Sequence, residues 1–197
     1  MATMTTTTTT TPTPITDKSS ALTAVSLSGD SLMQCTGLLR NDRDVVLTAV
    51  RSHVDALLWA SPELKEDKEI VLAAVTSFGR AIRYTQGLRS NRDIVLAAVT
   101  SDGNALQHVP RELRDDVEIV GQAIKSRPLA LQYASESCRG NVELLVAAGR
   151  LNKKVLAAAA SDEVRRAAEE RLKSGGGGGG GGGNNQWSTS NSMYGGR

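Results

Sequence analysis

The polar and apolar positions of this chain follow a pattern that returns at a nearly constant interval. Each copy opens with an acidic residue, continues with aliphatic residues and reaches an alanine five positions later. Five copies begin at spacings of 25, 24, 25 and 25 residues, with Asp44, Glu69, Asp93, Glu118 and Glu143. A degenerate copy, ALTAV at 21–25, precedes VLTAV at 46–50 by 25 residues. A fixed period of this size is typical of helical repeat proteins, so we divide residues 16–160 into six units.

Each copy predicts an α-helix of about eleven residues, because its apolar positions recur at helical spacing. In the third unit, Ile70, Val71, Ala74 and Val75 surround Leu72, which makes the helix apolar on most sides and predicts burial between two neighbours. The alanine five positions after each acidic residue is expected to mark close helix contact.

A good N-cap residue stands two positions before each acidic residue, where its side chain can accept from free backbone N–H groups. These N-cap residues are Asp42, Asp67, Asn91, Asp116 and Asn141. The acidic residue then lies in the first turn, at the positive end of the helix dipole. Its recurrence in five units favours a structural role over a catalytic one.

The second half of each unit also repeats, as ALLWAS at 56–61, AIRYTQ at 81–86, ALQHVP at 105–110, ALQYAS at 130–135 and VLAAAA at 155–160. We expect a second, shorter helix here, stopped by proline or glycine near Pro62, Gly87 and Pro110. Between the two helices, Gly29, Gly79 and Gly103 suit a left-handed C-terminal cap.

A single unit buries too few aliphatic side chains to offset its ordering entropy, so the units must stack. The predicted fold class is therefore all-α, a solenoid of about six two-helix repeats of about 25 residues. Residues 161–173 are polar, begin with Ser161 and carry Asp162/Arg166 and Glu169/Lys173 at ion-pair spacing. We expect this segment to be a helix that covers the C-terminal end of the stack, while the degenerate first unit covers the other end.

The sequence ALQYAS, followed by a leucine or cysteine, a basic residue, an acidic first turn and IVLAAV, resembles the repeat family called domain of unknown function 4116. The resemblance covers most of residues 16–160. It implies short helical repeats and supplies no activity and no catalytic residues. The sixth unit departs from the pattern, because Lys153 and Lys154 precede VLAAAA.

The two ends of the chain have compositions that do not favour a core. Residues 1–15 are rich in threonine and proline, and residues 174–197 contain an uninterrupted glycine run, so both are expected to be disordered. The first segment lacks the apolar run of a secretory signal, although its many hydroxyls leave a plastid transit peptide open. No apolar run reaches the ~18 residues of a membrane helix. We therefore expect a soluble, cytoplasmic protein.

Residues that commonly perform chemistry are few and scattered. His108 occupies a column that holds Trp59, Tyr84 and Tyr133 in other units, which favours packing. Cys35 and Cys138 occupy apolar columns four units apart, so neither a disulfide nor a zinc site is expected. Without a cluster of nucleophile, base and orienting group, we expect no enzymatic activity, no catalytic residues, no metal and no cofactor.

One basic residue per unit follows the leucine column, and equivalent positions align along a stack. This basic ladder comprises Arg40, Lys65, Arg89, Arg114 and Arg139. It is a candidate contact for nucleic acid or another acidic ligand. We favour the alternative that its members pair with the acidic residues four positions on, or with a neighbouring unit. Aromatic residues for base stacking are not interleaved with it.

The positions that differ from unit to unit, where the first helix turns, are His53, Phe78, Asp102 and Arg127. Repeat proteins keep their cores and vary their contact faces, so these four residues are the candidate contact face. A net charge of +2 points to no strongly charged partner. We therefore expect a binding module or scaffold for another protein, with nucleic acid as the less favoured partner.

Overall fold

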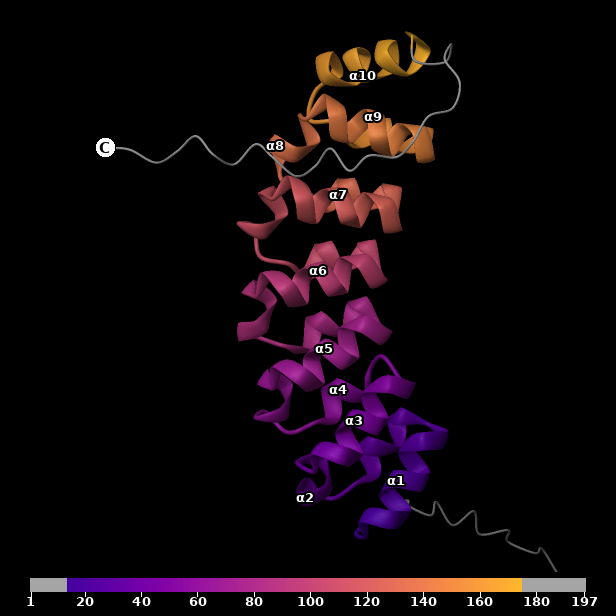
Figure 1. Cartoon of the computed structure of the whole chain (residues 1–197), viewed down its shortest axis with the longest axis vertical. Helices are drawn as coiled ribbons and strands as arrows, with labels where there is room; N and C mark the ends of the chain where they lie inside the picture. The colour runs from indigo at the N-terminus through magenta and orange to yellow at the C-terminus, as the bar shows by residue number, and fades with distance from the viewer. Residues whose placement is uncertain (1–13, 175–197) are drawn as a thin grey trace, which may run out of the picture.

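The computed structural model describes residues 14–174, and that part of the chain is all-α apart from one isolated β-bridge between Ile15 and Cys35. The expected tails, 1–15 and 174–197, lie almost entirely outside the described residues. Helical units stack in a single row, each packed on the unit before and the unit after it (Figure 1). The prediction of an all-α repeat fold is confirmed.

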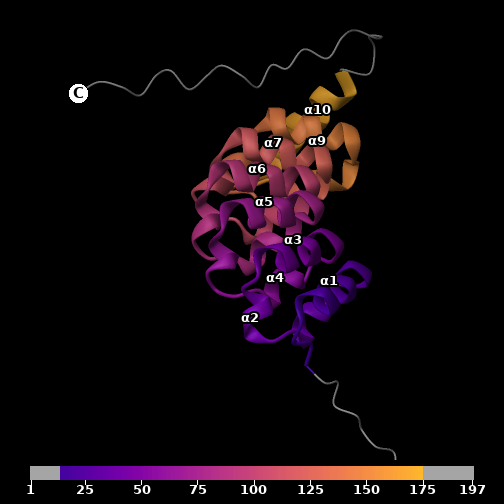
Figure 2. The same ribbon diagram turned by 60° about the horizontal axis from the view of Figure 1, so that its bottom comes forward.

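Each unit begins with a ten-residue α-helix. These six helices are α1 (Lys18–Leu27), α3 (Arg43–Ser52), α5 (Lys68–Ser77), α6 (Arg92–Ser101), α7 (Val117–Ser126) and α9 (Val142–Leu151). They pack side by side in chain order and form one layer of the stack (Figures 1 and 2).

The second helix of most units is a 3₁₀-helix, which the sequence did not predict. Five units have a 3₁₀-helix: η1 (Gly29–Gln34), η3 (Gly79–Tyr84), η5 (Gly103–His108), η7 (Pro128–Tyr133) and η8 (Lys153–Ala158). The second unit has the four-residue α-helix α4 (Ala56–Trp59) instead. Six residues is long for a 3₁₀-helix, which seldom exceeds about four residues, and the same length recurs in all five. These helices make the second layer and contact one another in order.

A third short helical segment, also not predicted, links five of the units to the next. These links are α2 (Gly37–Arg40), η2 (Leu64–Glu66), η4 (Gly87–Ser90), η6 (Leu113–Asp115) and α8 (Glu136–Arg139). The links contain the basic ladder, so its residues lie between the second helix of one unit and the first α-helix of the next.

The core lies between the two layers. In the fourth unit, Ile94, Val95, Ala98 and Val99 of α6 have no exposed surface, and η5 adds Leu106. Burying a large aliphatic side chain contributes about 2 kcal/mol, so each unit depends on its neighbours to complete this layer. Leu72 is an exception to the predicted burial, because it is 39% exposed on the outer side of α5.

The ends of the row are covered by polar helices. α10 (Asp162–Ser174) packs on α9, and the Ser161 hydroxyl caps it by accepting from the N–H of Val164. The ion pairs predicted inside this helix are wrong: Asp162 pairs with Arg165, one turn on, and Arg171 reaches Glu143 of α9. At the other end, α1 buries only Ala21 and Val25.

The predicted left-handed glycine cap is also wrong. α6 ends at Ser101, the following Asp102 is extended with φ −143°, and Gly103 opens the 3₁₀-helix without a left-handed φ. Glycine is required for a different reason. A β-carbon on Gly103 would lie 2.3 Å from the carbonyl oxygen of Ala123 in the next α-helix. The same close approach to a neighbouring alanine carbonyl occurs at Gly29 and Gly79.

Candidate functional site

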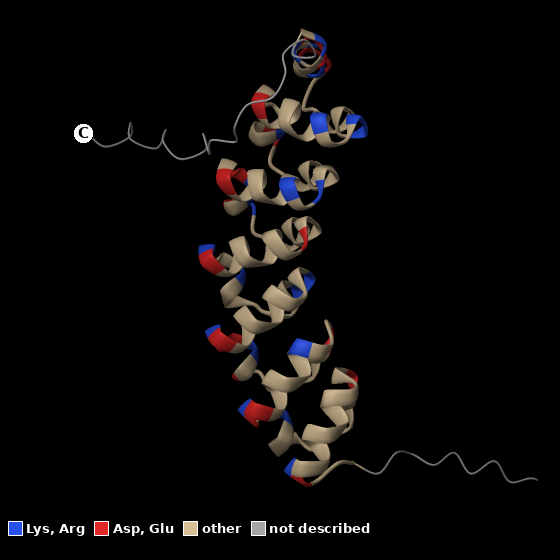
Figure 3. Ribbon diagram, turned by 45° about the vertical axis from the view of Figure 1, so that its right-hand side comes forward, with Lys and Arg blue, Asp and Glu red and all other residues tan. Residues whose placement is uncertain are grey.

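The row has two long edges of different chemistry, one at each end of the α-helices. We call the edge at the N-caps, Asp42, Asp67, Asn91, Asp116 and Asn141, the capped edge. The opposite edge is the turn edge, which contains His53, Phe78, Asp102 and Arg127. Figure 3 shows acidic and basic residues side by side at the starts of the α-helices. At the opposite ends they are mostly separate, and α7 and α9 have basic residues alone.

The predicted N-caps are confirmed at the capped edge. In each case the side chain accepts from the N–H groups two and three residues later, as Asn91 does from Asp93 and Ile94 at 3.2 and 3.3 Å. Asp17 caps α1 through the N–H of Ser20. These contacts satisfy backbone donors that the first turn of a helix leaves free.

The capped edge also carries ion pairs between units. The first residue of an α-helix reaches the cap or the acidic residue of the next unit, so Lys18 lies 2.9 Å from Asp42 and 2.7 Å from Asp44. Hydrogen bonds to Asp44 and then to Asp42 raise the pKa of Lys18. Equivalent pairs join Arg43 to Asp67 and Glu69, Lys68 to Asp93, and Arg92 to Asp116 and Glu118.

The first residues of these α-helices form a basic column, Lys18, Arg43, Lys68 and Arg92. It was not predicted from the sequence, although it has the same period as the column of acidic residues. It stops at Val117, which occupies the equivalent position in the fifth unit. There Glu143 pairs with Arg171 of α10 instead. The capped edge therefore neutralises most of its own charge.

The basic ladder does not make the predicted ion pairs. Its five residues are half-buried, and three of its arginines donate to main-chain carbonyl oxygens. Arg40 Nε donates to Cys35 at 2.9 Å, Arg89 Nε to Thr85 at 2.5 Å, and Arg114 Nη1 to Tyr133 of the next unit at 3.3 Å.

No side-chain hydrogen bond to a carbonyl oxygen is found for the other two members, Lys65 and Arg139, among the described residues. Lys65 lines a hollow beside Trp59, together with Arg40, and the Nε atoms of Arg114 and Arg139 are buried without a partner among the described residues. The ladder thus lies against the chain that links the units.

The turn edge contains a hollow of about 450 Å³ that extends from the second unit to the fifth. Three of the four predicted contact residues, Phe78, Asp102 and Arg127, line it. His53 lies outside the lining, one residue from Val54, which is part of it. Period alignment therefore named three of the ten residues that line the hollow.

Ion pairs cross the units around this hollow. Asp102, whose side chain is 14% exposed, lies 3.0 Å from Arg80 Nε and 2.8 Å from Arg127 Nε, so it joins the third, fourth and fifth units. Asp55 accepts from Arg83 at 2.8 Å and from the Tyr84 hydroxyl. The hydrogen bond from Tyr84 and the charge of Arg83 lower the pKa of Asp55.

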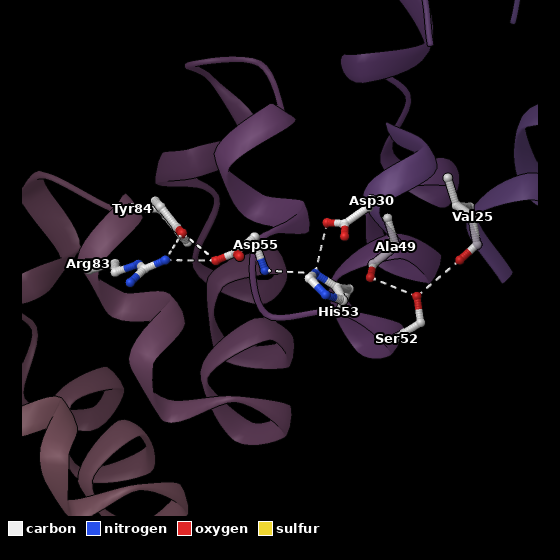
Figure 4. Close-up of polar contacts among 8 residues, drawn as sticks. All are labelled: Val25, Asp30, Ala49, Ser52, His53, Asp55, Arg83 and Tyr84. Atoms are coloured by element: carbon white, nitrogen blue, oxygen red, sulfur yellow. Dashed lines mark hydrogen bonds and ion pairs between the residues drawn. The ribbon is translucent and has the colours of Figure 1, made fainter. Parts of the chain in front are cut away.

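His53 continues this network toward the first unit (Figure 4). Its Nδ1 lies 2.9 Å from Asp30 and 3.2 Å from the backbone N–H of Asp55. Nδ1 accepts from the Asp55 N–H only through a free lone pair, and it donates to Asp30 only when it carries a proton. It can therefore make only one of these two hydrogen bonds at a time. Asp55, Arg80 and Arg83 were missed in the sequence, since their pairing depends on how the units stack.

Serine hydroxyls accept from the glycine N–H at two steps of the turn edge. The N–H of Gly79 donates to Ser101 Oγ at 3.2 Å, and the N–H of Gly103 donates to Ser126 Oγ at 3.1 Å. The next step along the row replaces both partners together: Pro128 has no N–H and Leu151 has no hydroxyl. Neither substitution leaves an unpaired group.

The remaining candidates for chemistry, Cys35, His108 and Cys138, do not line this hollow. Cys35 and Cys138 are free thiols in the core, and burial raises the pKa of both. His108 is half-buried in the aromatic column as predicted. Within residues 14–174, no three His, Cys, Asp or Glu side chains gather as metal ligands would, and no helix is long and apolar enough to cross a membrane.

The repeat geometry has a counterpart among known families. The model of the family described as "Domain of unknown function (DUF4116)" matches four overlapping stretches, 17–65, 55–86, 67–114 and 91–139. Together these cover more than half of the chain. The chain belongs to this family. The DUF4116 matches span the first five units and stop before α9. No curated protein and no solved structure matches the chain.

Proposed function

We propose that this DUF4116 chain is a non-enzymatic binding module or scaffold for another protein, and that the turn edge is its contact surface. The observation that carries the proposal is the hollow between the second and fifth units, where the residues that change from unit to unit meet. A repeat array that keeps its core and varies one edge has the build of a binding surface.

The other long surfaces favour this assignment by contrast. At the capped edge, charges pair between units as they do at the turn edge, but the caps and acidic residues there are of the same type in unit after unit and offer little that differs along the row. The arginines of the basic ladder donate to carbonyl oxygens of the chain itself. Binding nucleic acid through the ladder would require these donors to leave their partners, which is why a protein partner is favoured.

The chemistry of the hollow suits a protein ligand. Phe78 supplies an aromatic surface, while Arg80, Arg83 and Arg127 alternate with Asp55 and Asp102 around it. Aromatic residues and arginine are the types most often found at the energetic centres of protein interfaces.

Site-specific photocrosslinking tests the proposal. A photoreactive residue is placed at Ser77, which is exposed and lines the hollow, or at Leu72, which is exposed on the outer side of the same helix. In extracts of the producing cells we expect protein adducts from position 77 and few from position 72. Equal adducts from both positions, or none from position 77, would contradict the proposal.

A further inference from the structure

The turn edge changes its charge along the row. In the first four units its acidic residues Asp30, Asp55 and Asp102 each pair with a basic side chain. In the last two units the same edge carries cations and no acidic residue. We call this surface the basic patch; its cations are Lys125, Arg127, Arg150, Lys153 and Lys154.

The cations of the basic patch are accessible. All five are exposed, and Figure 3 shows basic residues at the C-terminal ends of α7 and α9, which are adjacent in the row. Within residues 14–174, Arg127 pairs with Asp102, and the other four have no acidic side chain within ion-pair distance. Four adjacent cations thus lack a counter-charge in the chain.

Stacking does not require these cations. Basic residues at the C-terminal end of a helix interact favourably with its dipole, yet α1, α5 and α6 have none in their last turns. Lys153 takes the column of Gly29, Gly79 and Gly103. The column is glycine at three steps where an alanine carbonyl of the following unit comes close, and Val54 and Pro128 hold it elsewhere. Within residues 14–174, the sixth unit is followed by α10 and not by another two-layer unit.

Apolar side chains are interspersed with the charges. Leu129 is 46% exposed and Leu151 is 60% exposed, each within three residues of a patch cation. Exposed leucines add nothing to a phosphate backbone, whereas they bury apolar area against a peptide that carries its own apolar residues. The patch itself contains no aromatic residue on which bases could stack.

The terminal segments of this sequence do not supply the complementary charge. Residues 1–13 and 175–197 contain no aspartate or glutamate. The acidic side chains of the capped edge are already paired with Lys18, Arg43, Lys68, Arg92 and Arg171, so the long acidic row of a second copy is not free to bind the patch.

We infer that the basic patch binds an acidic segment of a partner protein in which apolar residues alternate with carboxylates. This inference rests on the proposed function and names one part of the partner. The carboxylates pair with the lysines and arginines, and the apolar residues cover Leu129 and Leu151. Attraction between opposite charges also speeds the encounter and weakens as salt rises.

Fluorescence anisotropy with defined probes tests the inference on the full chain at low salt. The first probe is a labelled peptide in which pairs of glutamate alternate with leucine, and the second has alanine in place of leucine. The third is single-stranded oligothymidine of equal charge. The variants are Lys153→Gln with Lys154→Gln, and a control with Arg51→Gln and Arg111→Gln, which removes two exposed cations elsewhere. Equal melting temperatures establish that both variants fold.

We expect the leucine peptide to bind, the alanine peptide to bind more weakly, and the patch variant to lose about tenfold in affinity, as about 0.7 kcal/mol per lost charge pair gives. The control should stay within about twofold of the wild type. Equal binding by both variants, or no peptide binding, overturns the inference. Tighter oligothymidine binding that the patch variant loses assigns the patch to nucleic acid, and dimerisation that the same variant loses assigns it to a second copy.

The two proposals fail in different ways. If the acidic peptide does not bind while position 77 still forms protein adducts, the inference about the patch is wrong and the proposed function stands. If position 77 forms no adducts, the proposed function fails whatever the peptide does.

Discussion

A β-carbon on Gly103 would lie 2.3 Å from the carbonyl oxygen of Ala123, which belongs to the next α-helix of the row. Atoms at that distance overlap, so Gly103→Ala must push two units apart at the turn edge. Overpacking of this kind typically destabilises by about 1 to 3 kcal/mol. We expect Gly103→Ala to lower the free energy of unfolding by about 2 kcal/mol, measured by chemical denaturation.

Gly121 is the matched control, because a β-carbon there meets nothing within 4 Å and the residue lies inside α7. Alanine loses less backbone entropy than glycine in a helix, so Gly121→Ala should stabilise by about 0.5 to 1 kcal/mol. A loss of stability at both positions would mean that the tight contact at Gly103 is not what requires glycine.

The N-cap at Asn91 gives a second prediction. Its side-chain oxygen accepts from the N–H groups of Asp93 and Ile94, and an alanine would leave both donors to water. Loss of an N-cap typically costs about 1 kcal/mol. We expect Asn91→Ala to lower the unfolding free energy by that amount, while Asn91→Asp, which keeps an acceptor, stays close to the wild type. Equal losses in both variants would assign the effect to something other than the cap.

Val117 interrupts the basic column of the capped edge, and it is 39% exposed. Val117→Arg should extend the column toward Asn141 and Glu143, as Arg92 reaches Asp116 and Glu118. Exposed pairs contribute less than about 1 kcal/mol and are screened by salt. We therefore expect a small rise in melting temperature at low salt that disappears at high salt. A rise that persists at high salt would indicate packing instead of charge.

The repeat period predicted the fold because each unit must bury the same columns. It placed the caps at Asp42, Asp67 and their equivalents, and it located Phe78, Asp102 and Arg127 on one surface. Each of these predictions depends only on how one aligned position varies among the units and on where that position lies within its own unit. Neither requires knowledge of how the units stack.

The contacts between units were not predicted, because they depend on the displacement from one unit to the next. The acidic residues were expected to pair four positions back with the ladder, yet Glu118 reaches Arg92, 26 residues away, since the starts of adjacent helices lie side by side. For the same reason the glycine column was attributed to backbone conformation, when the cause is a carbonyl oxygen 20 residues on.

The change at Pro128 and Leu151 illustrates the same limit. In the sequence alone, Pro128 breaks the glycine column of Gly103 and Leu151 breaks the serine column of Ser126, and nothing connects the two changes. In the stack they occupy partner positions, so the donor and the acceptor disappear together and no buried group is left unpaired. Leu151 is also 60% exposed, close in sequence to Lys153 and Lys154 of the basic patch.

The imidazole of His108 gives a prediction for pH. Burial, and then the nearby Arg83, Arg89 and Arg80, lowers the pKa of His108 below its ordinary value of 6.5. Its Nε2 atom is buried and has no partner among the described residues. Between the lowered pKa and the ordinary one, the unfolded chain binds more protons than the folded chain. The contribution of His108 to stability is therefore full above the ordinary pKa and declines as pH falls below it.

We expect the melting temperature of the wild type to fall more than that of His108→Gln between about pH 7.5 and about pH 5.5, because glutamine cannot take up a proton. All other side chains are the same in both proteins, so the difference between the two slopes isolates the histidine. The measurement is thermal unfolding followed by circular dichroism at several pH values. Parallel slopes would mean that the imidazole is solvated in the folded state and that Arg83 and Arg89 do not oppose its charge.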